Sequence, residues 1–414
     1  MKQFPRGAKG VVVIAAIAIA SMVGLAGCSG TTASSTSTAS ATPYKIGFND
    51  DLSGPIAFAG VSNLAGFQTY IDQVNSTGGV NGHKIDLTSL DSKADAATSI
   101  TNYKQLASQD GDIGVFGNSA SSAWIATAPL AETYKVPMLG FGNADQYFTT
   151  FDKWMFKNSI TNSQQVALQG ELVSDTLFKG KNKGLKVGAL ETSTASGPQW
   201  LTAVQAVAKS KGWDLSSVQT VDIAATDCSA QAALLVQSGA QVIISDEIEA
   251  DVVCASALIQ RGFKGKIIET NSGIEEKTFQ TLASPQWIAM RTVNWWSDKT
   301  TPGTSALISE AKKFGTYSKL GDYSSDGYVA AQIAVAALKR CGAPSACTGT
   351  KYDDALAATK NLDTNGVAGP NLGFTTGPNG HTIPNVRFFV WSASKKQSVP
   401  LTAWLCAPSR CAGS

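Results

Sequence analysis

The sequence has few of the residues and none of the motifs that enzymes commonly use. Only two histidines occur in 414 residues, His83 and His381, each beside a glycine in an expected turn, where we expect solvated side chains rather than catalytic bases. The nucleophile elbow, the phosphate loop, the dinucleotide-binding glycines and the zinc-protease motif are all missing. No compact Cys-x-x-Cys pair accompanies the histidines, which argues against a metal site. The sequence therefore predicts no catalysis and no cofactor.

Charge and long apolar runs are also scarce. Charged residues make up 15% of the chain and the net charge is +2, without a cluster of lysine or arginine interleaved with aromatics, so we expect no nucleic-acid partner. Only residues 11–27 form a long uncharged apolar run, and it is shorter than the roughly 20 residues of a spanning helix. Hydrophobic residues make up 43% of the chain, as in a globular protein outside the membrane.

The N-terminal segment has the plan of a secretory signal peptide. Lys2, Arg6 and Lys9 precede the apolar run, and small residues end it. The stretch 25–28 reads LAGC and resembles the lipobox of bacterial lipoproteins, in which the thiol of the cysteine, here Cys28, receives a diacylglyceryl group. The alternatives are a chance cysteine in an ordinary signal peptide or a signal anchor.

A low-complexity segment follows Cys28. Residues 29–42 contain no charge, no aromatic and no large aliphatic side chain, so they cannot bury enough surface to fold and are expected to form a flexible tether. We therefore assign 1–27 to the signal peptide and 28–43 to the lipidated cysteine and tether. The protein is expected on the extracytoplasmic face of the cell membrane, held by two or more acyl chains.

Six cysteines remain once Cys28 is set aside. An even number in an exported protein indicates disulfides, although the sequence alone does not select among the possible connectivities. Proximity favours Cys341 with Cys347 and Cys406 with Cys411. Cys228 with Cys254 is then the remaining pair.

Short apolar runs alternate with longer amphipathic segments from residue 44 onward, which predicts an α/β fold with parallel sheets. The pattern occurs twice, so we expect two Rossmann-like lobes, and two independent Rossmann-like domains are the alternative. Strands are expected at 45–49, 84–90, 113–116, 137–140, 186–190, 218–222, 242–245, 266–269 and 388–391. Helices are expected at 61–75, 94–108, 122–134, 163–178, 198–211, 228–237, 250–261, 305–319 and 325–339.

Several segments occur in the order and spacing of a known family. They are residues 46–47, 52–55, 75–82, 85–91, 188 with 197, 239–242, 326–330 and 369–380. Through them the chain resembles the type I periplasmic binding proteins, in particular the group serving branched-chain amino acid and amide ABC transporters.

The resemblance implies a two-lobed protein that closes on a small molecule. The first lobe would comprise 44–158 plus 293–385 and the second 159–292 plus 386–414, with three strand crossings as a multi-strand hinge. Open α/β sheets bind ligands at the carboxyl ends of their strands, so the solute is expected there.

The resemblance also places candidate solute-binding residues. Residues 118–122 read NSASS, where hydroxyls and the N-H groups of a following helix suit a carboxylate. Ser121 falls at the family's ligand-binding serine, with Ser122 beside it, although either residue would also serve simply as a helix cap. Gly142 and Ala144 fall where the family presents main-chain atoms to the ligand.

Other positions depart from the amino-acid binders. Phe58 neighbours the alanine that stands in place of a covering aromatic, and Ser196 replaces a tyrosine. Asn271 falls where an acid pairs with the ligand's ammonium group, and asparagine brings no charge. Glu247 would substitute for that acid if it faced the cleft, whereas a solvated helix start is the more favoured interpretation of Asp246 and Glu247. Trp124 and Trp200 are expected in the core rather than in the pocket.

The function expected from the resemblance is capture of an amino acid, an amide or a related small organic solute for an ABC importer. The partners would be the solute and a permease with cytoplasmic ATPases, and the protein would be a monomer. A sensory lipoprotein that presents its liganded state to a receptor or regulator is the alternative.

Overall fold

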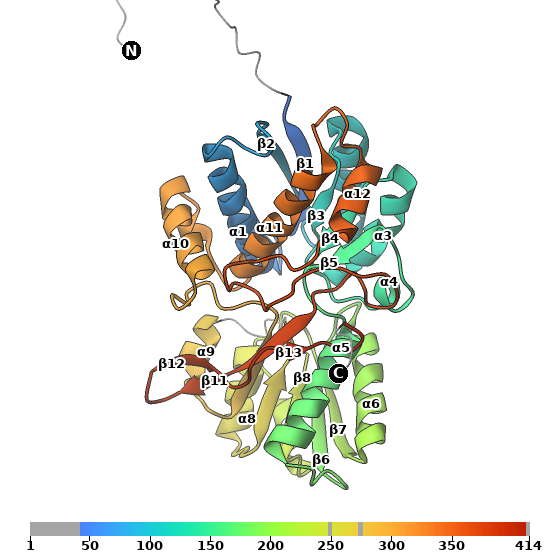
Figure 1. The fold of residues 1–414 in the computed structure, drawn as a ribbon. Helices are drawn as coiled ribbons and strands as arrows, with labels where there is room; N and C mark the ends of the chain where they lie inside the picture. The colour runs from blue at the N-terminus through green and yellow to red at the C-terminus, as the bar shows by residue number, and fades with distance from the viewer. Residues whose placement is uncertain (1–41, 247–250, 272–275, 411–414) are drawn as a thin grey trace, which may run out of the picture. The chain divides into compact units, whose positions relative to one another are not determined.

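The protein forms two lobes, each built on a β-sheet flanked by helices (Figure 1). The computed structural model describes residues 42–246, 251–271 and 276–410. The predicted signal peptide, Cys28 and nearly all of the predicted tether therefore lie outside the described residues, as do Glu247 and Cys411.

The first lobe contains a five-stranded parallel sheet in the order β2-β1-β3-β4-β5. Its strands are β1 (Tyr44–Asp50), β2 (Ile85–Asp91), β3 (Val115–Gly117), β4 (Met138–Gly140) and β5 (Met155–Lys157). Its helices are α1 (Ala57–Ser76), α2 (Ala96–Lys104), α3 (Ser121–Tyr134), α4 (Gln146–Thr149), α10 (Pro302–Phe314), α11 (Ser324–Cys341) and α12 (Gly349–Ala357).

Alternating side chains of this sheet enter two different hydrophobic cores. Phe116 and Leu139 pack with α1, α11 and α12 on one face. Val115 and Met138, their immediate neighbours in sequence, pack with Trp124 and α2 on the other face. Successive residues of a strand point to opposite sides, so strands covered on both sides are apolar throughout.

The second lobe contains a larger mixed sheet in the order β12-β11-β10-β9-β8-β6-β7, with β13 paired to β11. Strands β7, β6, β8, β9 and β10 are parallel, and β11 and β12 are antiparallel. The strands are β6 (Lys186–Thr192), β7 (Asp214–Val221), β8 (Val242–Ser245), β9 (Lys266–Glu269), β10 (Trp287–Arg291), β11 (Asn385–Ser392), β12 (Gln397–Pro400) and β13 (Leu405–Cys406). The helices are α5 (Asn162–Glu171), α6 (Gly197–Lys211), α7 (Ser229–Gln237), α8 (Asp251–Gln260) and α9 (Glu276–Leu282).

The second sheet also separates two cores. Ile244 and Ile268 pack with α5 and α6, whereas Ile243 and Ile267 pack with α7 and α8. The prediction of an α/β fold with two lobes and parallel central sheets is thus confirmed. The chain passes between the two sheets three times, at 157–162, 291–302 and 374–385.

Two of the expected disulfides are present. Cys228, at the start of α7, is bonded to Cys254 of α8, and Cys341, at the end of α11, is bonded to Cys347. The third pairing involves Cys411, outside the described residues, and stays a prediction.

The expectation of a solvated His381 is wrong. Its ring is 2% exposed and stacks on Phe156 at a centroid distance of 4.0 Å. Its Nδ1 atom lies 3.0 Å from the carbonyl oxygen of Met155, and burial lowers the pKa of His381 to about 4. His381 therefore belongs to the packing of the third crossing and is neutral at pH 7.

Candidate solute-binding site

A cavity of about 280 Å³ lies between the two lobes. Most of the wall area is apolar, and hydroxyl and amide side chains supply most of the polar groups. The apolar lining residues are Pro55, Ile56, Phe58, Ala59, Ala94, Ala120, Phe141, Ala195, Ile223 and Tyr323. The polar lining residues are Asn63, Ser119, Ser121, Ser122, Asn143, Asn158, Ser159, Ser193, Thr194, Asn271 and Asp326. Among these described lining residues Asp326 is the only charged one.

A tight turn after β3 brings the serine-rich segment to the cavity. Gly117 has φ +112°, and a Cβ atom there would lie 2.4 Å from the carbonyl oxygen of Asn49. Asn118 also has a positive φ, and its N-H donates to the same carbonyl over 2.7 Å. Glycine and asparagine tolerate this left-handed backbone, which turns the chain from β3 into α3.

Two buried carboxylates hold this segment in place. Asp50 accepts hydrogen bonds from the N-H of Ser119 over 2.8 Å and from its hydroxyl over 3.1 Å. Asp51 accepts from the N-H of Ala120 and the N-H of Ala94, each over 2.8 Å. Burial, with the adjacent Asp51 adding to it, raises the pKa of Asp50 to about 7. The end of β1 thus fixes the loops that follow β2 and β3.

The N-terminus of α3 opens at the cavity without a side-chain cap. Ala120 occupies the N-cap position and has no hydroxyl, so the alternative interpretation of Ser121 or Ser122 as a simple helix cap is wrong. The first N-H groups of a helix have no intrahelical acceptor and carry a partial positive charge. This turn is therefore suited to an anionic group of a solute.

Ser121 joins the two lobes directly. Its Oγ lies 3.0 Å from the Oγ of Ser196, at the start of α6, and accepts from the N-H of Asn143 over 3.4 Å. A hydroxyl in this position contacts the first lobe, the second lobe and the cavity at once.

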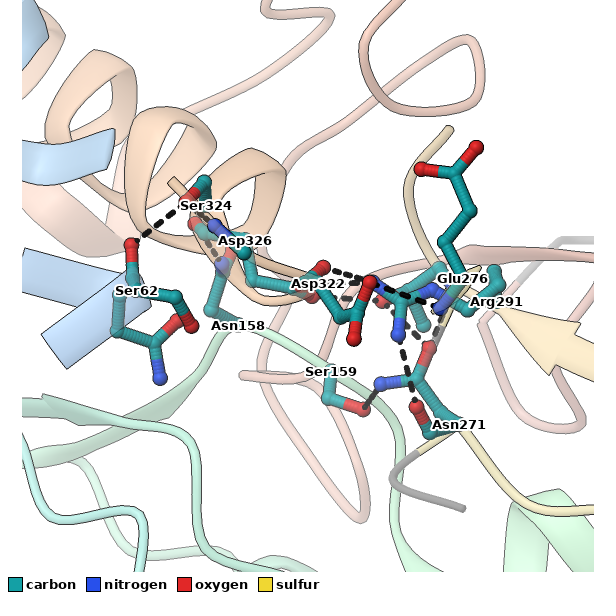
Figure 2. Close-up of polar contacts among 12 residues, drawn as sticks. Ser62, Asn158, Ser159, Asn271, Glu276, Arg291, Asp322, Ser324 and Asp326 are labelled. Carbon is teal, nitrogen blue, oxygen red and sulfur yellow. Dashed lines mark hydrogen bonds and ion pairs between the residues drawn. The ribbon is translucent and has the colours of Figure 1, made fainter. Parts of the chain in front are cut away.

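A buried ion pair between Arg291 and Asp326 connects the second sheet with the first lobe (Figure 2). Arg291 ends β10, is fully buried, and donates to Asp326 Oδ2 over 2.9 Å and to the carbonyl oxygen of Asp322 over 2.7 Å. Asp326 lies in the first turn of α11. Burial raises the pKa of Asp326 to about 6, although Arg291 beside it acts in the opposite direction. The one charged lining side chain is thus already paired.

Asn271 uses its side chain to join two of the crossings. Its Oδ1 accepts from the N-H of Thr292 over 2.6 Å and from the hydroxyl over 3.1 Å, and its Nδ2 donates to Ser159 Oγ over 3.3 Å (Figure 2). Asn271 therefore lines the cavity while its amide is hydrogen-bonded to two of the crossings.

The structure brings together part of the predicted site. Phe58, Ser121, Ser122 and Asn271 line the cavity, and Ser196 reaches it through Ser121. Solute contact by each of these residues stays a prediction.

Two further predicted residues lie behind the lining. A Cβ atom on Gly142 would lie 2.9 Å from Trp124 Cβ, and Ala144 is packed in the core of the first lobe. Phe141 and Asn143, each next to Gly142, line the cavity instead. Solute contact by Gly142 or Ala144 stays a prediction.

The remaining predictions concern acids and tryptophans. The prediction for Glu247 lies outside the described residues. Asp246 is 3% exposed and accepts from Thr270 Oγ1 over 3.3 Å, so the interpretation of a solvated Asp246 is wrong, and burial raises its pKa to about 8. Trp124 and Trp200 are buried in core clusters, as expected.

Several lining residues were not predicted as site residues. Asn143, Asn158, Thr194 and Tyr323 follow strands or precede a helix, where the sequence offers no periodic signal. Asp326 is one of the family-typical positions, but its pairing with Arg291, 35 residues earlier, has no local signature.

The family of periplasmic binding proteins matches residues 43–397. The chain belongs to this family. A curated relative, the Leu/Ile/Val-binding protein homolog 8 of Brucella melitensis, is 23% identical over 355 residues, which cover 83% of this chain and 86% of the relative.

Solved structures of similar proteins share the fold. A branched-chain amino acid transporter substrate-binding protein of Streptococcus pneumoniae, in complex with isoleucine, has a TM-score of 0.72 and 18% identity, with 88% of this chain and 99% of that chain covered. A solute-binding protein of an ABC transporter of Rhodopseudomonas palustris, in complex with p-hydroxybenzoic acid, has a TM-score of 0.73 and 18% identity, with 88% and 97% covered.

The family match and the curated relative confirm the predicted periplasmic binding protein and solute capture as its role. Proteins of this family work outside the cytoplasm. In the part of the chain that the structure describes, no helix combines the length and the apolar character that a membrane crossing needs.

Proposed function

We propose that this binding protein captures small organic acids with an apolar body, and that the three crossings serve as the hinge on which the lobes close. The uncapped N-terminus of α3 inside a mostly apolar cavity carries the proposal. The solute's carboxylate would accept hydrogen bonds from the first turn of α3 and from Ser121, and its hydrocarbon part would pack between Phe58, Phe141 and Tyr323.

The cavity is less suited to a solute that carries an ammonium group. Asp326, the only charged residue among the described lining residues, is paired with Arg291, and Asn271 holds Thr292 and Ser159. A solute ammonium buried here without a carboxylate partner would be costly. Acids that lack an amino group therefore fit the described lining better than amino acids do.

The relatives support this range of solutes. One structural neighbour was solved with isoleucine and another with p-hydroxybenzoic acid, so the fold accommodates a carboxylate with or without an amino group. Closure would be driven by contacts made only when both lobes touch the solute, such as those of Ser121 and the Ser193–Thr194 segment.

Thermal shift and calorimetry with benzoate, p-hydroxybenzoate and 3-methylpentanoate test the proposal. We expect at least one of these acids to raise the melting temperature, since a ligand that binds only the folded state stabilises it. Neutral benzamide, which matches benzoate in shape, is expected to stabilise less. Stabilisation by benzamide and by none of the acids would overturn the proposal.

Replacement of one hydroxyl tests the location. Ser121→Ala is expected to weaken binding of the best acid by about fivefold to tenfold, which is the loss of one hydrogen bond of about 1 kcal/mol. The control is Ser210→Ala, because Ser210 is exposed near the end of α6. Equal affinities of wild type and Ser121→Ala would remove Ser121 from the site.

We also propose that lipid on Cys28 anchors the protein at the outer face of the membrane. The proposal rests on the signal-peptide plan and the LAGC sequence at 25–28. In a bacterial host, Cys28→Ser is expected to move the protein from the membrane fraction to the soluble fraction and to remove the mass of the acyl groups. Retention of the acyl mass in Cys28→Ser would contradict lipidation at this residue.

A further inference from the structure

A buried lysine lies directly behind the cavity. Lys157 ends β5, and the two residues that follow it, Asn158 and Ser159, both line the cavity. The Lys157 side chain is fully buried. Its Nζ donates to the carbonyl oxygen of Gly142 and, over 3.2 Å, to Oδ1 of Asn143.

Asn143 connects this ammonium group to the candidate anion site. Asn143 lines the cavity, and its N-H donates to Ser121 Oγ over 3.4 Å. Lys157 ends β5, Asn143 follows β4 and Ser121 follows β3, and the carboxyl ends of these three neighbouring strands meet at one edge of the sheet. A single residue, Asn143, therefore connects the ammonium group with the hydroxyl of Ser121 in the first turn of α3, through its side-chain oxygen and its backbone N-H.

The charge of Lys157 is poorly compensated in the described structure. None of the ion pairs within the described residues includes Lys157, and its two acceptors are neutral amide oxygens. Asp145 is the acid that acts on it electrostatically, but the Asp145 carboxylate already accepts from the N-H groups of Asn162 and Ser163. Burial lowers the pKa of Lys157 to about 7, as expected for an ammonium group that lacks a close counter-charge.

Arg291, in the same region, is a buried cation whose charge is compensated by a nearby carboxylate. Its guanidinium is equally buried, but it lies 2.9 Å from the Asp326 carboxylate. Removing a buried charge from water is costly unless an opposite charge is placed close to it. For Arg291 the protein supplies that charge, whereas at Lys157 the cavity leaves room for a solute to supply it.

We propose that Lys157 is the specificity-determining counter-charge for the solute, and that it selects carboxylates over neutral molecules of the same shape. This inference rests on the proposed function, because it assigns the charge preference of that same cavity. The carboxylate would bind at the first turn of α3, and Lys157 would stabilise it through the low-dielectric layer formed by Asn143 and Gly142. Lys157 acts through space and through Asn143, so it is a positioning and electrostatic residue rather than a contact residue.

The test compares benzoate with benzamide, which have the same shape and differ in charge. In the wild-type protein we expect benzoate to bind more tightly. In Lys157→Met we expect the benzoate affinity to fall about tenfold while the benzamide affinity changes less than twofold, so that the ratio of the two dissociation constants collapses. If Lys157 had a purely structural role, its replacement would lower the affinities for benzoate and benzamide equally.

The control removes the same charge from a nearby position. Lys153 lies four residues earlier, is half exposed, and pairs with Asp353 and Asp354. Lys153→Met is expected to leave the ratio unchanged. If Lys157→Met does not fold, Lys157→Gln, which keeps a hydrogen-bond donor, carries the same expectation.

The outcomes separate this inference from the proposed function. Tighter binding of benzoate than benzamide in wild type, with the same ratio in both Lys157 variants, overturns the inference and leaves the proposed function standing. Binding of benzamide, but of none of the acids, in wild type overturns both.

Discussion

The carboxylates of Asp50 and Asp51 hold two loops of the first lobe in place. They are adjacent, buried, and together accept backbone N-H groups from the loops after β2 and β3. Their proximity raises the electrostatic cost of ionising both, and the hydrogen bonds offset part of that cost. The site therefore rests on two acids that do not themselves line it.

This arrangement predicts a pH-dependent contribution of Asp50 to stability. Its pKa is higher in the folded protein than in the unfolded chain, so this stability is fully present below about pH 4 and is lost as the pH rises through about 7. Asp50→Asn imitates the protonated form and keeps an oxygen for the N-H groups of Asp51 and Ser119.

Urea unfolding at pH 5 and pH 8 checks this prediction. We expect Asp50→Asn to be more stable than wild type at pH 8, on the order of 1 kcal/mol, with a smaller difference at pH 5. Asp175→Asn, at an exposed position, is the control. A difference of the same size at both pH values would contradict the assignment.

The turn after β3 predicts a steric cost at Gly117. Gly117→Ala places a methyl group 2.4 Å from the carbonyl oxygen of Asn49 and forces alanine into φ +112°. Gly111→Ala is a matched control, because Gly111 also has a positive φ, +75°, but no atom within 4 Å of the added Cβ. Denaturant unfolding is expected to show a loss of about 1 kcal/mol for Gly111→Ala and at least twice that for Gly117→Ala. Equal losses would show that the turn tolerates the methyl group.

At the scale of elements, the sequence predicted the strands whose apolar runs are bounded by glycine or polar turns. Strands β8 and β9 have the expected bounds, because each has a buried apolar centre that polar residues bound: β8 reads VIIS and β9 reads KIIE. β5 (MFK) and β10 (WIAMR) were missed because no glycine bounds their runs, whereas the equally short β3 and β4 each end in a glycine.

The expected helices at 94–108 and 163–178 each end in a wider turn. The α-helical part stops at Lys104 and at Glu171, and π-helical turns continue over Gln105–Asp110 and Leu172–Leu177. One wider turn shifts the buried face of the helix only slightly, so the pattern of apolar residues does not reveal the π-helical turn.

The two described disulfides predict different costs of removal. Cys228–Cys254 closes a separation of 26 residues and Cys341–Cys347 a separation of 6. In the chain-entropy account the first restricts the unfolded chain more, with about 3 kcal/mol against about 2 kcal/mol. Unfolding of the Cys228→Ala/Cys254→Ala and Cys341→Ala/Cys347→Ala variants measures both, and a larger loss for the second would contradict this order.

At the scale of the molecule, the ion pair of Arg291 and Asp326 connects the end of the second sheet with the first lobe. Removing one partner leaves a buried charge without compensation. We expect Arg291→Met and Asp326→Asn each to destabilise the protein by about 3 kcal/mol. The double variant is expected to lose less than the sum, and strictly additive losses would show that the pair is not coupled.

The family and the two-lobed plan followed from the sequence because glycine turns, strands and helices occur in a recognisable order. Only some residues of the candidate site could be predicted from the sequence. Ser121 was predicted from the family resemblance together with its place after a strand, whereas Lys157 and Arg291 act through partners that the fold brings together from distant segments. Such pairings depend on how strand ends meet, which local patterns do not encode.

We have proposed that the cavity binds a carboxylate without requiring an amino group. Calorimetric titration of the protein with isoleucine and with 3-methylpentanoate, its counterpart without the amino group, measures this preference. We predict that 3-methylpentanoate binds at least as tightly, because the described lining offers the ammonium group no unpaired carboxylate. Tight binding of isoleucine together with no binding of 3-methylpentanoate would contradict the account.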